Sequence, residues 1–494
     1  MTVNRHASAL ARALHRPPPV VTIARMSRRA ALLIVLALWA AIYLPALGSL
    51  EIKGEEGRRI LPAITMLRTG HYLVPQIGSE PYFRKPPLVN WLVAASFQLT
   101  GTRNEWTARA PSVLSVLAVA LAFIFVARRT LGAGPSLVAA VIWLTNFGVI
   151  EKGRLIEIEA LYVALFGLAF VCWLSWWEER RSPWLTWTVP WIFLGLGLLA
   201  KGPLLLLFFY AIVVAILVAA RESRQLWRAP HLLGVAIMLG LFAAWAIPCL
   251  QSMHATPVAG IWTRQLSGRL GGSDFKLGSW LLNLPRAFAY FLPWLLLAPL
   301  LRPRVSLFAS PVFRAVFFGA GAPFLLLLLL PSALPRYAMP LLVPACWLLA
   351  IALRESDLAW FGRKFARPPW PWIIGITAAA VALCVLVYAS AIVPKLQRRE
   401  KVRTIARQID GVLGDGQTLF AVDPDYQPFL FYLRSRLEYV SELTDLPADA
   451  RFVLVQPANE AGMNDAKRWA PRTAKALLRT TDYRSRSVIL FQID

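Results

Sequence analysis

The sequence predicts an α-helical polytopic membrane protein with about 11 transmembrane helices and a small C-terminal α/β domain. Apolar runs recur from about residue 30 to residue 393, and 57% of the 494 residues are hydrophobic. Runs of about 20 apolar residues are typical of transmembrane helices, and one soluble core does not need so many. The remaining stretch, 394–494, has the mixed composition of a soluble protein.

The basic residues, which give a formal net charge of +25, fall in clusters between alternate apolar runs. This is the positive-inside pattern, so we expect a multi-pass protein of a bacterial inner membrane, with a cytoplasmic N-terminus and a periplasmic C-terminus. A nucleic-acid-binding protein would concentrate its basic residues on one soluble face, so no nucleic-acid partner is predicted. The clusters are Arg25, Arg28 and Arg29; Arg128 and Arg129; Arg180 and Arg181; Arg221, Arg224 and Arg228; Arg302 and Arg304; Arg363, Lys364 and Arg367.

In chain order, the sequence predicts a disordered basic arm at 1–29, a transmembrane region at 30–393 and a periplasmic domain at 394–494. The transmembrane region includes a polar external loop at 51–108. The candidate spans lie near 30–49, 109–127, 135–150, 160–177, 185–200, 203–220, 231–250, 280–300, 314–331, 336–353 and 371–393.

The C-terminal region has the pattern of a small α/β domain. An amphipathic segment predicts a helix over 402–413 that ends at Gly414 or Gly416. Short runs rich in β-branched and aromatic residues predict strands, and two other segments predict helices between some of them. The strands are TLFAVD, LEYVSE, RFVLVQ and SVILFQ, and the helices are YQPFLFYLRS and NDAKRWAP. Because the region has no recognisable catalytic motif, we expect it to cover or shape the mouth of an active site.

The loop at 51–108 is polar in a chain that is mostly apolar. It carries the carboxylates Glu51, Glu55 and Glu56 and the basic residues Lys53, Arg58, Arg59 and Lys85. One interpretation is a connector whose charges pair with one another, because Glu55 stands three and four residues before Arg58 and Arg59. The other interpretation is a catalytic loop at the outer membrane surface.

Three segments of this loop resemble the first external loop of polytopic GT-C glycosyltransferases: GEEGRR, GHYLVPQIGSEPYFRKPPL and NEWTARAPS. Among these enzymes, the chain looks most like bacterial aminoarabinose transferases that modify lipid A, and more distantly like protein O-mannosyltransferases. The resemblance implies a GT-C fold and sugar transfer from a polyprenyl-phosphate donor to a lipid, glycan or protein acceptor at the periplasmic face. It places Glu55 at the position of the family's key Asp, with Glu56 as the alternative.

The same resemblance assigns Arg58 and Lys85 to the family's Arg and Lys, which implies that they bind the donor phosphate. Arg binds phosphate with two parallel hydrogen bonds and Lys binds it as a point charge, so the chemistry agrees. Alternatively, Lys85 extends its amino group to the membrane surface at a helix start, before Pro86 and Pro87.

Three further candidates lie in the other external segments. Glu159 takes the family's second acidic position; alternatively, Glu157 and Glu159 only stabilise a helix N-terminus. Lys201 begins a Lys-Gly-Pro turn like that of the family; alternatively, it only faces a helix C-terminus. Tyr337 resembles a family Tyr whose hydroxyl donates to the phosphate; alternatively, it is an interfacial aromatic residue.

No metal site is predicted, because Arg84 stands where some members of the family have a metal-binding acid. A requirement for a divalent cation is left open. Two other functions also stay open. A transporter or flippase of lipid-linked sugars would carry polar residues at mid-membrane depth. A non-catalytic relative is compatible with Glu at two positions where the family usually has Asp. The sequence specifies neither the sugar nor the acceptor.

Overall fold

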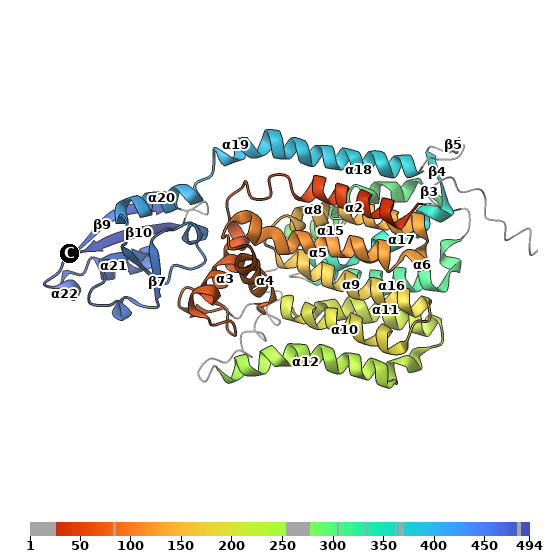
Figure 1. Ribbon diagram of the computed structural model, residues 1–494, viewed down its shortest axis with the longest axis horizontal. Coiled ribbons are helices and arrows are strands. Elements are labelled where there is room, and N and C mark those ends of the chain that lie inside the picture. The colour runs from red at the N-terminus through yellow and green to blue at the C-terminus, as the bar shows by residue number, and fades with distance from the viewer. Residues whose placement is uncertain are drawn as a thin grey trace, which may run out of the picture.

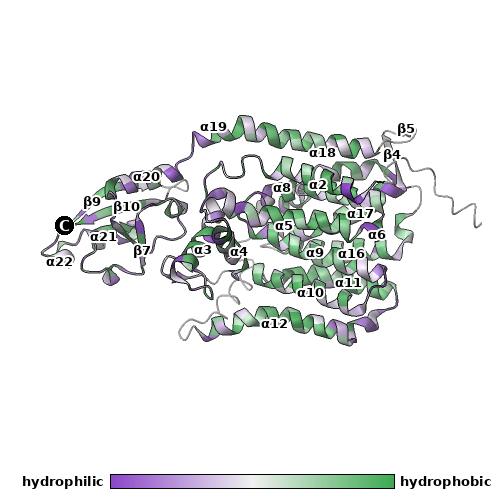
Figure 2. Ribbon diagram, viewed as in Figure 1, coloured by the Kyte–Doolittle hydropathy of each residue, from purple (hydrophilic) through white to green (hydrophobic). Residues whose placement is uncertain are grey.

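The computed structural model describes residues 26–82, 85–252, 277–303, 306–330, 334–360, 363–364, 370–481 and 486–494. Most of the predicted basic arm and Arg84 lie outside these residues. The described chain forms a bundle of apolar helices and a smaller domain built on a β-sheet, and the two are joined at one end of the bundle (Figure 1). Figure 2 shows that hydrophobic residues dominate the bundle helices.

Seven helical stretches of the described chain are long and apolar enough to cross a membrane, or eight if one bent pair counts as a single span. The bent pair is α7 and α8, which meet at 55°. The predicted count of about 11 stays a prediction. The principal bundle helices are α2 (Arg28–Tyr43), α5 (Glu105–Phe125), α7 (Ala133–Leu144), α8 (Phe147–Gly153), α9 (Ile158–Glu178), α10 (Pro183–Ala200), α11 (Leu204–Ala219), α12 (Ala229–Gln251), α16 (Pro311–Leu329), α17 (Leu342–Glu355) and α18 (Trp370–Val387).

The stretch predicted as a span at 280–300 is not one continuous helix. It divides into the end of α14 (Leu277–Leu281), α15 (Asn283–Ala289) and the 3-10 helix η4 (Trp294–Leu300). Pro293 lies at the break between α15 and η4, where its missing backbone N–H disfavours a continuous α-helix.

The segment 51–108, predicted as an external loop, is largely helical, which agrees with the helical spacing of Glu55 and Arg58. The 3-10 turn η2 (Gly54–Glu56) leads directly into α3 (Gly57–Thr69), which ends at Gly70 with a φ of +74°. A left-handed residue at this position commonly ends a helix, and glycine adopts it without strain. A short hairpin, β1 (Gln76–Ile77) and β2 (Glu80–Pro81), then leads toward α4 (Leu88–Thr100).

The basic clusters gather at the end of the bundle that lies opposite the sheet domain (Figures 1 and 2). They occupy α6 (Arg128–Leu131), the turns after α9 and α11, and the small sheet of β3 (Leu301–Pro303), β4 (Ser356–Trp360) and β5 (Arg363–Lys364). The described part of the predicted charge pattern therefore lies on one side of the bundle.

The C-terminal domain begins after α19 (Val393–Gln397) and contains a five-stranded sheet in the order β7-β6-β8-β10-β9. Strand β6 is parallel to β7 and β8, whereas β10 is antiparallel to β8 and β9. The elements are α20 (Val402–Leu413), β6 (Thr418–Val422), η8 (Pro428–Phe431), β7 (Arg436–Val440), β8 (Phe452–Val455), α21 (Glu460–Met463), α22 (Ala466–Trp469), β9 (Ala474–Thr481) and β10 (Ser487–Ile493).

Two features of this domain differ from the prediction. The segment YQPFLFYLRS contains only the single 3-10 turn η8 instead of a longer helix. Strand β9 was not predicted; it is an edge strand with mostly exposed or half-buried side chains, so it has no apolar run to mark it. The predicted helix at 402–413 and the four predicted strands are present.

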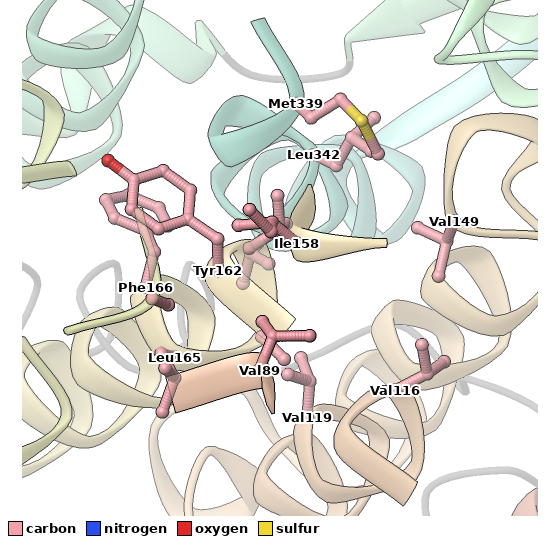
Figure 3. Close-up of a cluster of buried hydrophobic side chains, with 14 of the residues drawn as sticks. Val89, Val116, Val119, Val149, Ile158, Tyr162, Leu165, Phe166, Met339 and Leu342 are labelled. Atoms are coloured by element: carbon pink, nitrogen blue, oxygen red, sulfur yellow. The ribbon is translucent and has the colours of Figure 1, made fainter. Parts of the chain in front are cut away.

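A cluster of buried side chains packs the start of α9 against the segment before α17 (Figure 3). Ile158 and Tyr162 of α9 pack in this cluster with Met339 and Leu342 from the segment before and within α17. Between membrane helices such side chains are held by close van der Waals packing. The packing therefore holds the first turn of α9 close to the segment around residue 337.

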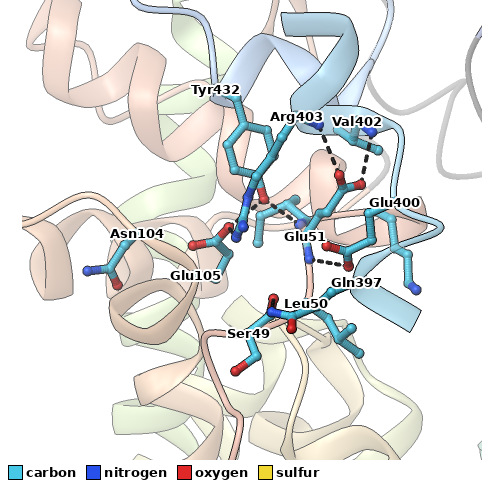
Figure 4. Close-up of polar contacts among 12 residues, drawn as sticks. Ser49, Leu50, Glu51, Asn104, Glu105, Gln397, Glu400, Val402, Arg403 and Tyr432 are labelled. Carbon is cyan, nitrogen blue, oxygen red and sulfur yellow. Dashed lines mark hydrogen bonds and ion pairs between the residues drawn. The ribbon is translucent and has the colours of Figure 1, made fainter. Parts of the chain in front are cut away.

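Glu51 joins the bundle to the C-terminal domain (Figure 4). Its carboxylate accepts hydrogen bonds from the backbone N–H groups of Val402 at 2.9 Å and Arg403 at 3.0 Å, at the start of α20. The first N–H groups of a helix have no partner inside the helix, and a negative charge there is favoured by the helix dipole. Tyr432 adds a second connection, because its hydroxyl donates to Glu105 at 2.7 Å and accepts from the backbone N–H of Ile52 at 2.6 Å.

Candidate active site

A small polar cavity of about 40 Å³ lies at the end of the bundle that faces the C-terminal domain. Five separate parts of the chain supply its walls: the η2–α3 segment, Lys85, the start of α9, the turn after α10, and the start of the 3-10 helix η6 (Pro335–Leu341). The lining residues are Glu55, Arg59, Lys85, Glu157, Ile158, Glu159, Lys201, Arg336 and Tyr337. Five of the seven predicted site residues are therefore brought together: Glu55, Lys85, Glu159, Lys201 and Tyr337.

Glu159 is the centre of an ion-pair network in this cavity. Its Oε1 lies 3.1 Å from Nζ of Lys201 and 3.3 Å from Nε of Arg336. The side chains of Glu159 and Lys201 are only 6% and 10% exposed. Charges this deeply buried need partners, because leaving water costs several kcal/mol per ion. Glu159 therefore does more than stabilise the N-terminus of α9: it holds two cations beside the cavity.

The packing of α9 positions Lys201 through Tyr162. The Tyr162 hydroxyl donates to the carbonyl of Gly202 at 3.2 Å and accepts from the backbone N–H of Leu205 at 2.5 Å. Gly202 has a φ of +114°, which favours glycine. The Nζ of Lys201 then lies 5.2 Å from the ring centre of Tyr162 and 5.3 Å from that of Tyr337. At this range the aromatic faces attract the cation, so both rings stabilise its position.

Glu157, one residue before α9, has a shifted pKa. Burial, and secondly the charge of Glu159, raise its pKa to about 7, while Lys152 at 3.6 Å opposes the shift. Its charge therefore changes near neutral pH. Sequence reasoning considered Glu157 together with Glu159 but placed only Glu159 among the site residues. The close spacing of two carboxylates across one residue is the signal that predicts such a coupled pair.

Glu55 lines the cavity, and Arg58 holds it there without lining the cavity itself. Nη1 of Arg58 donates to both carboxylate oxygens of Glu55, at 3.1 and 2.9 Å. The same guanidinium lies over the ring of Tyr426 in the C-terminal domain, with its central carbon 3.9 Å from the ring centre. The domain thus contacts the candidate carboxylate through a single intermediate side chain.

Glu56 does not line the cavity, and its carboxylate is held by contacts that support the fold. Its carboxylate accepts two hydrogen bonds from Arg109, each at 2.9 Å, and a third from the backbone N–H of Ile156 at 3.1 Å. Both side chains are almost fully buried, at 4% and 3% exposure. This pair connects η2, α5 and the segment before α9, and it does not line the cavity.

Two cations of the cavity were not assigned by sequence reasoning. Arg59 is 8% exposed, and its Nη1 donates to the Tyr82 hydroxyl at 3.1 Å. Arg336 belongs to the Leu-Pro-Arg-Tyr segment quoted for Tyr337. With them the lining contains four cations and three carboxylates, a formal excess of one positive charge. Protonation of Glu157 increases this excess, so the cavity favours an anion.

An apolar groove of about 650 Å³ runs along the bundle next to the cavity segment. It lies between α7, the segment from α15 to η4, α16 and α17, and nearly all of its lining is apolar. The 3-10 helix η6 (Pro335–Leu341) carries Arg336 and Tyr337 at its start and Leu341, which lines the groove, at its end. The short helix η6 therefore connects the polar cavity to the apolar groove.

In the described part of the chain, no three His, Cys, Asp or Glu side chains form a group suited to holding a metal ion. The arrangement can instead hold an anionic group by several cations, with a carboxylate beside it, and an apolar chain in the groove. This combination suits a lipid-linked phosphate.

A family model of dolichyl-phosphate-mannose-protein mannosyltransferases matches residues 84–247, less than half of the chain. An undecaprenyl phosphate-α-4-amino-4-deoxy-L-arabinose arabinosyl transferase of Pseudomonas fluorescens is 26% identical over 346 residues, 66% of this chain and 57% of that protein. The corresponding transferase of Pseudomonas aeruginosa is 27% identical over 354 residues, 66% of this chain and 60% of that protein. The chain thus matches less than two thirds of the length of these relatives.

Among solved structures, ArnT from Cupriavidus metallidurans bound to undecaprenyl phosphate gives a TM-score of 0.69 at 18% identity. The match covers 93% of this chain and 97% of that one. The same protein in its apo state gives a TM-score of 0.65. The predicted resemblance is therefore confirmed: the chain has the fold of a GT-C glycosyltransferase, and its sequence is similar to those of bacterial aminoarabinose transferases.

Proposed function

We propose that the protein is an integral-membrane glycosyltransferase that moves a sugar from a polyprenyl-phosphate donor to a cell-envelope acceptor. The observation that carries this proposal is the cavity in which four cations and three carboxylates converge beside an apolar groove. The donor class is supported by the names of the relatives and by the undecaprenyl phosphate in the similar structure. The acceptor belongs to one of three classes: a lipid A-like lipid, another glycan or a protein.

The polar cavity and the apolar groove bind different parts of the donor. Lys85, Arg59 and Arg336 supply the cations for the phosphate, and Lys201 adds a fourth from the turn after α10. The apolar groove takes part of the polyprenyl tail, because its lining is as apolar as the membrane interior in which that tail lies. The segment η6 joins the two, so head and tail are held by one continuous stretch of chain.

The reaction changes the charge of the phosphate. An acceptor oxygen attacks the anomeric carbon, and the bond between that carbon and the phosphate oxygen breaks. Polyprenyl phosphate then leaves as a monoester, with more negative charge than the donor diester. Cations around the phosphate therefore stabilise the transition state more than the bound donor, which is the condition for catalysis.

Glu55 is the carboxylate that we assign to the acceptor. For a hydroxyl acceptor it acts as a general base, a role worth about 10²- to 10⁴-fold in rate. For an ionised phosphate acceptor it positions the group and balances the nearby cations. Arg58, which pairs with Glu55 at 2.9 Å, orients the carboxylate in either case. Glu159 organises Lys201 and Arg336, and Glu56 supports the fold.

We also propose that the site faces the periplasm, because the basic clusters occupy the opposite end of the bundle (Figure 1). A transporter would need polar residues along a path through the membrane, whereas these charges sit where α9 begins and α10 ends.

The test compares purified wild-type protein, Lys85→Ala and Glu55→Gln. We expect Lys85→Ala to weaken binding of a fluorescent polyprenyl phosphate about tenfold, from the loss of roughly 1–3 kcal/mol at a charged contact. Glu55→Gln should keep binding and lose sugar transfer. Arg314→Ala is the matched control, because Arg314 is an exposed arginine near the opposite end of the bundle.

Mass spectrometry of lipid A, other lipids and envelope glycans from a deletion strain identifies the acceptor. A deletion strain with an unchanged envelope, together with no sugar transfer by the wild-type protein, would contradict the proposal. Transfer by Glu55→Gln at the wild-type rate would contradict only the role assigned to Glu55. Donor binding without any transfer would favour a transporter or a non-catalytic relative.

A further inference from the structure

A second cavity, of about 770 Å³, lies between α3 and the C-terminal domain, apart from the candidate active site. Its first wall is α3 and the turn between α4 and α5, and its second wall is the segment from η8 to β7. Strand β7 is at the edge of the sheet, and the Arg68 guanidinium donates a hydrogen bond to the carbonyl of Leu437 on it. Side chains of the two parts of the molecule thus meet across the cavity.

The cavity has both apolar and basic walls. Leu61, Ile64 and Leu67 line it from one face of α3, at the three-residue spacing that places side chains on a common face. Leucines from the C-terminal domain line the other side. Four arginines lie among them: Arg68, Arg103, Arg434 and Arg436. A purely structural interface would bury the apolar residues and leave arginines at its margin, whereas here both line one space.

Arg68 and Arg103 carry like charges that interact with each other. Partial burial, and secondly the positive charge of Arg68, lower the pKa of the Arg103 guanidinium from its usual value. Within the described residues, no carboxylate lies within 4.0 Å of either guanidinium; Glu438, the carboxylate in the lining, pairs with Arg436 at 2.8 Å. Burial raises the pKa of Tyr439 to about 12, so its hydroxyl is neutral at pH 7. Its ring, 5.1 Å from the central carbon of the Arg68 guanidinium, attracts that cation but carries no negative charge that would neutralise it.

From these features we propose that the cavity binds the phosphate-bearing headgroup of an amphiphilic lipid. Arg68 and Arg103 contact the phosphate, and a phosphate between two guanidinium groups converts their repulsion into two charge-assisted interactions. The leucines contact the adjoining apolar part of the molecule. Arg434, whose guanidinium also has no carboxylate within 4.0 Å in the described chain, supplies a third cation at the rim.

The position of the cavity suggests that this lipid is the acceptor, a role that rests on the proposed function. Arg59 in the first turn of α3 lines the active site, and Arg68 in its last turn lines the second cavity. Nine residues of helix span about 13 Å. A glycolipid acceptor with more than one polar group can bridge this distance, with one group at Glu55 and a phosphate at Arg68.

The test measures binding of short-chain phosphatidic acid to the full-length protein in detergent, with short-chain diacylglycerol and inorganic phosphate as the other two probes. We expect phosphatidic acid to bind, and Arg68→Ala and Arg103→Ala to weaken its binding about tenfold each. Both variants should bind polyprenyl phosphate as the wild type does, because neither arginine lines the active site. Arg407→Ala, an exposed arginine of α20 outside the cavity, is the control.

Three results would overturn the proposal. Phosphatidic acid could bind equally to the wild type and to the double variant Arg68→Ala/Arg103→Ala, diacylglycerol could bind as tightly as phosphatidic acid, or inorganic phosphate could bind as tightly as phosphatidic acid. The last result would indicate a site for a free anion. If transfer is absent with every donor but the arginine-dependent binding is observed, the proposed function fails and the lipid site stands. If transfer occurs and its KM for the acceptor is unchanged in both variants, the acceptor role is wrong.

Discussion

Replacing Glu51 with Gln should loosen the C-terminal domain from the bundle. Glu51 is 2% exposed, and its two oxygens accept from the backbone N–H groups of Val402 and Arg403 at 2.9 and 3.0 Å (Figure 4). Hydrogen bonds to a charged group contribute about 1.5–3 kcal/mol each. Gln retains one neutral acceptor and places an NH₂ group against the other N–H, so the expected loss is roughly 2–4 kcal/mol.

Hydrogen exchange followed by mass spectrometry measures this loss at α20. Where exchange requires local opening, each 1.4 kcal/mol of lost stability raises the exchange rate about tenfold, so we expect an increase of about 30- to 1,000-fold. The bundle helices should exchange as before. Arg58, which pairs with Glu55, stacks on Tyr426 of the same domain. We therefore also expect slower sugar transfer, because a loosened domain leaves Glu55 poorly oriented.

Glu438→Gln is the matched control, since its ion pair with Arg436 is exposed and such pairs contribute at most about 1 kcal/mol. If α20 in Glu51→Gln exchanges within about threefold of the control, Glu51 does not hold the domain in place, and the assigned energetics are wrong.

Three other predictions concern the site and the topology. Glu159→Gln should lower transfer tenfold or more, because Lys201 and Arg336 lose their shared carboxylate; Glu159→Asp should retain part of the activity, and equal rates for all three proteins would exclude an organising role. Glu157, with a pKa of about 7, gains its negative charge as the pH rises, so affinity for the proposed donor should fall between about pH 6 and 8, and Glu157→Gln should abolish this dependence. The proposed donor is a phosphodiester whose own charge is constant in this range, so a pH-independent wild type would refute the reasoning. Alkaline phosphatase fused after Asp494 should be active in a bacterial host, whereas a stable but inactive fusion would place the C-terminus in the cytoplasm.

The fold class and the polar end of the bundle follow from the sequence because both depend on local chemistry. Long apolar runs require a helix in a membrane, and arginine clusters mark one side of it. The helix at 402–413 and the four predicted strands follow from periodicity in the same way. The limits are also local: Pro293 lies at a break in the run at 280–300, and β9 lacks an apolar face.

The choice between neighbouring side chains was decided by the tertiary structure. Successive residues of a helix point about 100° apart, so of Arg58 and Arg59 only one faces the cavity, and packing selects Arg59. Likewise, Glu55 faces the cavity while the adjacent Glu56 pairs with Arg109, which is 53 residues away in the chain. Sequence position alone places Arg58 and Arg59, and likewise Glu55 and Glu56, at the same membrane surface. Only the contacts made by α5, α9 and the C-terminal domain determine which member meets the substrate, because these contacts join residues that are distant in the sequence.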